Sequence, residues 1–142
     1  MLQRGDYVLC NFPFREVRGP GPSPHIVLCA GAGHSARIRF AVVFYTTTQI
    51  EFQGARRPRQ YLLVDKTRAI ELGQKAAFHV DASRLARLPL TIDYFPELNG
   101  GTIPVRGRDS EFVNKVMERM RELTASGFAI TKVDAVSTSR ID

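Results

Sequence analysis

Side chains that could bind phosphate or transfer a proton gather in three stretches of the sequence. The first stretch, residues 15–25, contains Arg15, Glu16, Arg18, Ser23 and His25. The second is the end of an apolar run, at Thr46, Thr47, Thr48 and Gln49. The third contains Arg56, Arg57 and Arg59, followed by Asp65. Guanidinium and hydroxyl groups donate hydrogen bonds to phosphate, and an imidazole or a carboxylate can move a proton. Together the stretches predict a basic, hydroxyl-lined cleft of the kind that holds a single-stranded nucleic acid.

Each stretch also has a plain structural interpretation. Threonines are common at strand ends because they are β-formers and cap turns. An arginine-rich loop is commonly a solvated surface, and a single histidine beside a strand is commonly structural. Asp65, just before Lys66 and Thr67, is a candidate helix cap. Taken singly, each feature is better explained by structure, so the functional interpretation depends on the stretches meeting in space.

The composition limits the class of protein. The chain has 142 residues, 44% hydrophobic and 24% charged, which is the range of an ordinary globular domain and excludes wholesale disorder. Of its 20 cations 16 are arginine, the formal net charge is +6, and residues 1–71 carry ten cations against five anions. This bias favours a polyanionic partner on the first half of the chain, although a modest positive charge also serves solubility alone.

Several classes of site are not expected. No apolar run is long enough to span a membrane, and residues 1–6 do not resemble a secretory signal, so we expect a cytoplasmic protein without a membrane partner. Cys10 and Cys29 lack the spacing of a metal or redox motif and are expected to be buried, reduced thiols. The three histidines stand apart and no nucleotide-binding loop is present, so neither a metal nor another cofactor is predicted.

The hydrophobic pattern predicts a sheet followed by a long helix. Strands are expected over residues 6–12, 25–30, 37–47, 61–65 and 77–80, with a possible further strand over 90–94. Helices are expected over 67–72, between a cap at Asp81 and a stop at Pro89, and over 110–126. This order predicts one mainly β, α+β domain over residues 1–142. Its core would be a small, strongly curved antiparallel sheet or open barrel with the C-terminal helix packed on it, and the tail would be frayed from about residue 134.

The chain contains, in order, the segments RGDYVLCNFPF, GPSPHIVLCAG, FYTTTQ, LVDKTRAIELG and VDASRLARLP. This succession, over roughly residues 4–126, resembles the PemK/MazF-type toxins of bacterial toxin–antitoxin pairs. The resemblance implies an SH3-like barrel that forms a homodimer, cleaves single-stranded RNA as an endoribonuclease without a metal ion, and is neutralised by a cognate antitoxin protein.

The resemblance also implies roles for single residues. Thr47 matches the catalytic threonine of the family, whereas Ser23 stands where the family has an arginine. Arg18 could supply the missing guanidinium and His25 an imidazole, while Asp65 matches an acidic position used in some members.

Metal-free RNA cleavage needs a base, an acid and a donor for the charge that develops on the phosphate. We therefore expect Arg18 to stabilise that charge, Thr47 to donate a hydrogen bond to the phosphate, and His25 or Asp65 to transfer the proton. Further RNA contacts are expected from Arg15, Ser23, Thr46, Thr48, Arg56, Arg57 and Arg59. Because Ser23 replaces an arginine, an inactive module that binds nucleic acid or a peptide is the alternative. An unrelated small barrel with a structural role is the third possibility.

Overall fold

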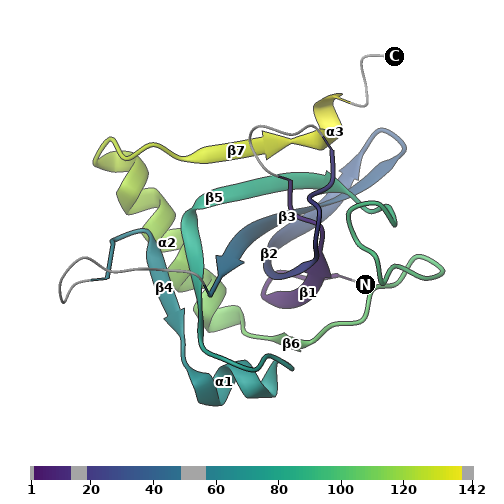
Figure 1. The fold of residues 1–142 in the computed structure, drawn as a ribbon. Helices are drawn as coiled ribbons and strands as arrows, with labels where there is room; N and C mark the ends of the chain where they lie inside the picture. The colour runs from purple at the N-terminus through teal and green to yellow at the C-terminus, as the bar shows by residue number, and fades with distance from the viewer. Residues whose placement is uncertain (1, 14–18, 49–56, 139–142) are drawn as a thin grey trace.

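The computed structural model describes residues 2–13, 19–48 and 57–138 (Figure 1). The strands are β1 (Asp6–Cys10), β2 (His25–Ser35), β3 (Ile38–Thr47), β4 (Tyr61–Val64), β5 (Phe78–Pro89), β6 (Gly107–Arg108) and β7 (Thr131–Asp134). The helices are α1 (Lys66–Glu71), α2 (Ser110–Ala125) and α3 (Ala135–Thr138). Strands predominate and the long helix α2 comes late in the chain, which confirms the predicted mainly β, α+β class.

The strands form one sheet in the order β4-β5-β3-β2-β1-β6, and β7 also pairs with β5. Every pair is antiparallel except that of β5 with β7. Within the described residues the sheet is not closed, because β4 and β6 end this order without pairing with each other. Antiparallel pairing brings the start of β2 to the end of β3, so His25 and Thr47 lie at the same end of the sheet.

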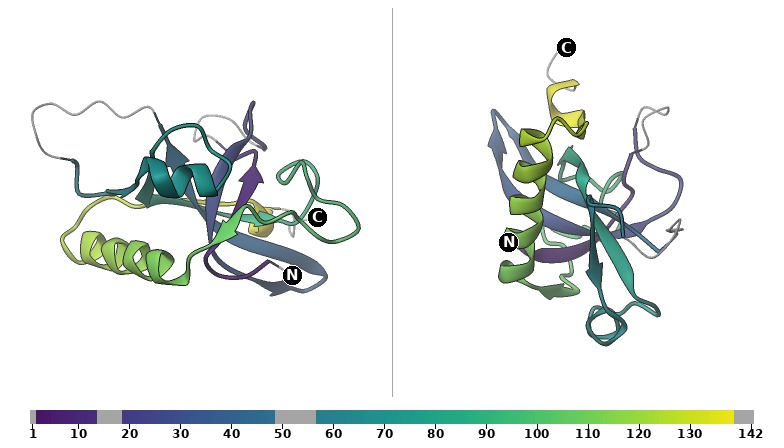
Figure 2. Two further views of the ribbon diagram at one scale, coloured as in Figure 1. Left: turned by 90° about the horizontal axis from the view of Figure 1, so that it is seen from below. Right: turned by 90° about the vertical axis from the view of Figure 1, so that its left-hand side faces the viewer.

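Apolar side chains cover both faces of the sheet. On one face Leu28 packs in a cluster with Val113 of α2, which lies across this side of the sheet (Figures 1 and 2). On the other face Val27 and Leu88 pack in a second cluster with Phe95. Because successive residues of a strand point to opposite faces, strands buried on both faces have continuous apolar runs, as in HIVLCA of β2.

The helix predicted after Asp81 is wrong, because β5 continues as a strand through that segment. Asp81 does accept hydrogen bonds as a cap would, from the backbone N–H of Ser83 at 2.9 Å and from its hydroxyl at 2.6 Å. These bonds lie at an irregularity where the pairing of β5 with β3 shifts register. Beyond it, Leu85 and Ala86 are buried in the clusters on opposite faces. This alternate burial is a strand pattern, and it outweighs the helical propensity of the local sequence.

One other segment differs from the sequence-based expectation. The possible strand over residues 90–94 is wrong, because that segment turns: the backbone N–H groups of Tyr94 and Phe95 both donate to the carbonyl of Thr91. Phe95 is fully buried, which anchors the turn on the second cluster. Of the tail expected to fray from about residue 134, the described part contains the end of β7 at Asp134 and then α3, with Val136 buried, and residues 139–142 lie outside the described residues.

The predicted long helix and the predicted buried thiols are both confirmed. The carboxylate of Asp109 caps α2 by accepting a hydrogen bond of 3.0 Å from the backbone N–H of Phe112. Cys10 and Cys29 are free and buried. In the described part of the chain, no helix has both the length and the apolar character needed to cross a membrane.

Candidate functional site

A cavity of about 530 Å³, here called the Thr47 cavity, lies where β2 begins and β3 ends. Its lining includes five of the residues predicted to bind or act on a ligand: Ser23, His25, Thr46, Thr47 and Thr48. Tyr45, Gln74 and Phe78, which the sequence-based prediction did not include, also line it. The first two polar stretches of the sequence therefore meet in space.

The hydroxyls of the three threonines differ in their surroundings. Thr46 is only 3% exposed, and its hydroxyl donates a hydrogen bond to the carbonyl of Ile26 in β2. That hydrogen bond therefore links β3 to β2, which is a structural role and not a ligand-binding one. Thr47, the next residue, points to the opposite face of β3 and is partly exposed, and Thr48 is exposed. Thr47 and Thr48 are thus more accessible from the cavity than Thr46 is.

His25 lies beside an aromatic and a cationic side chain. Its ring centroid is 5.5 Å from that of Tyr45, and the guanidinium carbon of Arg84 lies 4.5 Å from the centroid of the Tyr45 ring. Burial, and secondarily the positive charge of Arg84, lower the pKa of His25 below its ordinary value of 6.5. The imidazole is therefore neutral at neutral pH and can accept a proton.

A second histidine, His79, lies directly across from Thr47 in the pairing of β3 with β5. Its Nε2 accepts a hydrogen bond of 3.0 Å from Nε of Arg57, so in the neutral ring the proton is on Nδ1. Burial, and secondarily Arg57, lower the pKa of His79. Since His25 belongs to β2 and His79 to β5, the two strands that flank β3 each place an imidazole beside the end of β3 that carries Thr47. The sequence-based prediction missed His79, because the register in which β5 pairs with β3 cannot be read from the sequence.

Asp65 is not part of the Thr47 cavity. Its side chain is the N-cap of α1 and accepts a hydrogen bond of 2.9 Å from the backbone N–H of Arg68. This is the structural interpretation that the sequence offered for Asp65. Of the two proton-transfer candidates, the structure places only His25 at the cavity.

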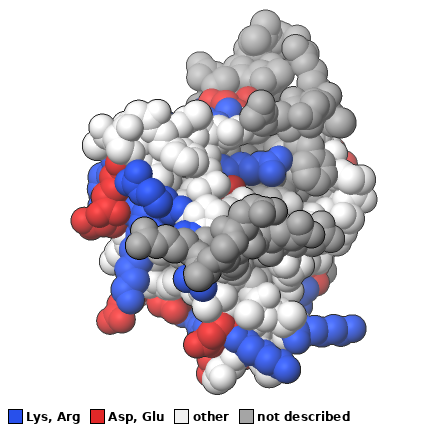
Figure 3. Space-filling model, turned by 60° about the vertical axis from the view of Figure 1, so that its left-hand side comes forward, with Lys and Arg blue, Asp and Glu red and all other residues white. Residues whose placement is uncertain are grey.

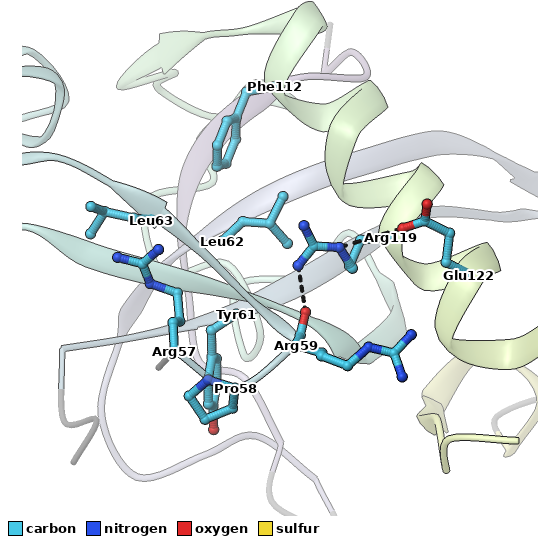
Figure 4. A pocket seen from close by; sticks show the side chains of 9 residues that line it. All are labelled: Arg57, Pro58, Arg59, Tyr61, Leu62, Leu63, Phe112, Arg119 and Glu122. Atoms are coloured by element: carbon cyan, nitrogen blue, oxygen red, sulfur yellow. Dashed lines mark hydrogen bonds and ion pairs between the residues drawn. The ribbon is translucent and has the colours of Figure 1, made fainter. Parts of the chain in front are cut away.

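The arginine-rich stretches are described only in part. Arg15, Arg18 and Arg56, predicted to contact RNA or to stabilise charge, lie outside the described residues. Arg57 and Arg59 line a second cavity, of about 650 Å³, between β4 and α2 (Figure 4). Its lining, which defines the β4–α2 cavity, includes Arg57, Arg59, Tyr61, Leu62, Phe112 and Arg119. Of the third stretch, none of the described residues lines the Thr47 cavity, but Arg57 is hydrogen-bonded to His79, which pairs with Thr47.

Charges of both signs are mixed on the surface near α2. Arg119 pairs with Glu122 at 3.5 Å, and Arg121 pairs with Glu118 at 3.8 Å. On the face seen in Figure 3, positive side chains are accordingly interspersed with negative ones. An argument for an anionic ligand must therefore rest on particular side chains at the two cavities and not on a uniform positive field.

Comparison with known proteins adds no identification. No protein-family model matches the chain, and no curated protein shows significant similarity to it.

Proposed function

We propose that the protein binds single-stranded RNA in the Thr47 cavity and cleaves it without a metal ion. The observation that carries the proposal is the placement of His25 and His79 on the two strands that flank Thr47. Neighbouring strands are about 4.8 Å apart, so the backbones of β2 and β5 are about 10 Å apart with β3 between them. A phosphodiester group held over Thr47 would have an imidazole on either side.

The proposed reaction is a transesterification within the RNA chain. Neutral His25 accepts the proton of a ribose 2′-hydroxyl, the 2′-oxygen bonds to phosphorus, and the bond from phosphorus to the 5′-oxygen breaks. His25 then returns the proton to that 5′-oxygen, so the products are a 2′,3′-cyclic phosphate and a 5′-hydroxyl. The hydroxyl of Thr47 and Nδ1–H of His79 are the donors proposed for the phosphate oxygens, where negative charge develops.

Cleavage of single-stranded RNA in the presence of EDTA tests this proposal. Thr47→Ala and His25→Gln each remove one group from the reaction, and we expect each to slow cleavage by about 10²-fold or more. Asp65→Asn is the matched control, because asparagine also caps helices and Asp65 lies outside the cavity. Cleavage at the wild-type rate in both cavity variants would refute the assignment of the site.

The resemblance to PemK/MazF-type toxins supports the proposal that this activity is toxic, is neutralised by an antitoxin protein, and belongs to a homodimer. Expression of the wild-type chain should then arrest bacterial growth, and expression of the Thr47→Ala variant should not. The mass of one chain is 15.9 kDa, and light scattering should give twice this mass for the dimer. Normal growth with the wild-type chain expressed would contradict the toxin role, and a mass of one chain would contradict the dimer.

The second candidate function is a module that binds RNA without cutting it. The observation that favours it is Ser23, an exposed hydroxyl in the Thr47 cavity at the position where the resemblance leads us to expect an arginine. Removal of one charge-stabilising group typically slows catalysis by about 10²–10³-fold. Salt-dependent RNA binding with no product after prolonged incubation would favour this second function over cleavage.

A further inference from the structure

The β4–α2 cavity combines cationic, aromatic and aliphatic side chains. Three arginines, Arg57, Arg59 and Arg119, stand around an apolar floor that includes Leu62 and Phe112 (Figure 4). Among the described residues that line the cavity, the only acidic one is Glu122, which is paired with Arg119. The local charge is therefore positive and suits an anion.

Arg119 and Arg59 have different parts in this arrangement. Arg119 of α2 donates a hydrogen bond to the backbone carbonyl of Arg59, so it fixes the chain that leads into β4 (Figure 4). The side chain of Arg59 is exposed and makes no hydrogen bond or ion pair with the other described residues. Arg119 is thus a positioning residue, while the Arg59 guanidinium is available for a bidentate phosphate contact.

A row of rings crosses the sheet from one cavity to the other. His25 and Tyr45 line the Thr47 cavity, and His79 lies across from Thr47 on the next strand. The Tyr61 ring of β4 lies 6.0 Å from His79 and lines the β4–α2 cavity. Arg57 joins the two ends, since it lines the β4–α2 cavity and donates to His79. Aromatic rings at successive strands beside arginines are the arrangement on which single-stranded bases stack.

We propose that the β4–α2 cavity is a second RNA subsite, which stacks a base on Tyr61 and holds its phosphate with Arg59. The inference rests on the proposed function, because the row of rings begins at the Thr47 cavity. It adds that recognition extends across β5 to β4, so the protein should bind an RNA of several nucleotides more tightly than one that fills only the Thr47 cavity.

The length dependence of RNA binding tests this subsite. The probes are 2′-O-methyl RNAs of randomised sequence, three or nine nucleotides long, which lack the 2′-hydroxyl needed for the proposed cleavage. We expect the wild-type protein to bind the nonamer at least tenfold more tightly than the trimer. Tyr61→Leu removes the ring but keeps an apolar side chain, and should reduce the nonamer affinity about tenfold. Tyr61→Phe keeps the ring and should restore the wild-type affinity.

A matched pair of arginine variants separates a specific phosphate contact from bulk charge. Loss of one phosphate contact to a single strand reduces the slope of log K against log salt concentration by about 0.7. Arg59→Ala should show this change for the nonamer. Arg121→Ala removes the same charge from α2, but its side chain pairs with Glu118 and does not line the cavity, so the slope should stay at its wild-type value.

The outcomes distinguish failure of the subsite from failure of the proposed function. If the wild-type protein binds neither probe and cleaves no RNA, the proposed function is wrong. If it binds the nonamer but Tyr61→Leu binds with wild-type affinity, the second subsite is wrong while RNA binding stands. Equal changes of slope in Arg59→Ala and Arg121→Ala would also overturn the subsite, because only bulk charge would then be at work.

Discussion

Arg57 and His79 are joined by a hydrogen bond of 3.0 Å, in which Nε of the guanidinium donates to Nε2 of the imidazole. A protonated imidazole has no acceptor, so this bond exists only with the neutral ring. It connects the chain ahead of β4 to the residue of β5 that pairs with Thr47 of β3. This charge-assisted contact therefore links Arg57, which lines the β4–α2 cavity, to the residue that pairs with Thr47 in the sheet.

Replacement of Arg57 should raise the pKa of His79. The lowered pKa of His79 arises first from burial and then from the positive charge of Arg57, so Arg57→Gln removes only the second cause. We expect an upward shift toward, but not up to, the ordinary value of 6.5. Titration of the ring protons by NMR measures it, with Arg59→Gln as the control that removes an equal charge. An unchanged or lower pKa of His79 in Arg57→Gln would show that the bond does not tune the ring.

Cleavage should fall at acid pH and stay constant near neutral pH. The proposed base, His25, acts in its neutral form, and its pKa is lowered below 6.5 by burial and by Arg84. As the pH falls through that pKa, His25 gains a proton and the rate should drop tenfold per pH unit. Arg84→Gln removes one cause of the lowered pKa and should move the drop to higher pH. A rate that falls already between pH 7.5 and 6.5 in the wild-type protein would contradict this assignment.

Gly107 of β6 should not tolerate a methyl group. A Cβ atom placed there would lie 2.5 Å from Cδ2 of Leu72, which is fully buried beside α1. Because such overpacking forces a buried side chain to shift, Gly107→Ala should lower the free energy of unfolding by about 1–3 kcal/mol. Gly31→Ala is the control, since nothing lies within 4 Å of its Cβ position, and should change the free energy of unfolding by less than about 1 kcal/mol. Urea unfolding compares the two, and equal midpoints would contradict the packing described for β6.

The two cysteines should be unreactive in the folded protein. Burial raises the pKa of both thiols, that of Cys29 to about 12, and only the thiolate reacts with disulfide reagents. We expect no thiol to react with Ellman's reagent in the native state and two to react after unfolding in guanidinium chloride. A native thiol that reacts within seconds would show that Cys10 or Cys29 is exposed by a motion of the sheet.

Local pattern was sufficient for much of the fold. The strands that begin near residues 6, 25, 38 and 61 carry apolar runs bounded by turn residues, and α2 has helical spacing with Asp109 as a cap. The segment after Asp81 was mispredicted because its cap-like hydrogen bonds and helix-forming residues are local, whereas the burial that makes it a strand comes from distant parts of the chain.

The same limit explains which part of the candidate site the sequence could predict. His25 begins one apolar run and Thr47 ends the next run along the chain, so an antiparallel hairpin was enough to bring them together. His79 joins them only through the register of β3 with β5, which depends on the irregularity near Asp81 and is not visible in the sequence. Asp65 and Thr46 were candidates by residue type alone. In the structure Asp65 caps α1, and the hydroxyl of Thr46 is hydrogen-bonded to the backbone of β2.

The chemical ends left on a single-stranded RNA test the central claim most directly. The wild-type protein is incubated with the RNA in EDTA, and the termini of the products are identified by mass spectrometry. The proposed chemistry at His25 and Thr47 predicts a 2′,3′-cyclic phosphate on one fragment and a 5′-hydroxyl on the other. It also predicts that a single 2′-deoxy nucleotide at the cleaved position abolishes the product. RNA that stays intact, or fragments that carry 5′-phosphates, would contradict it.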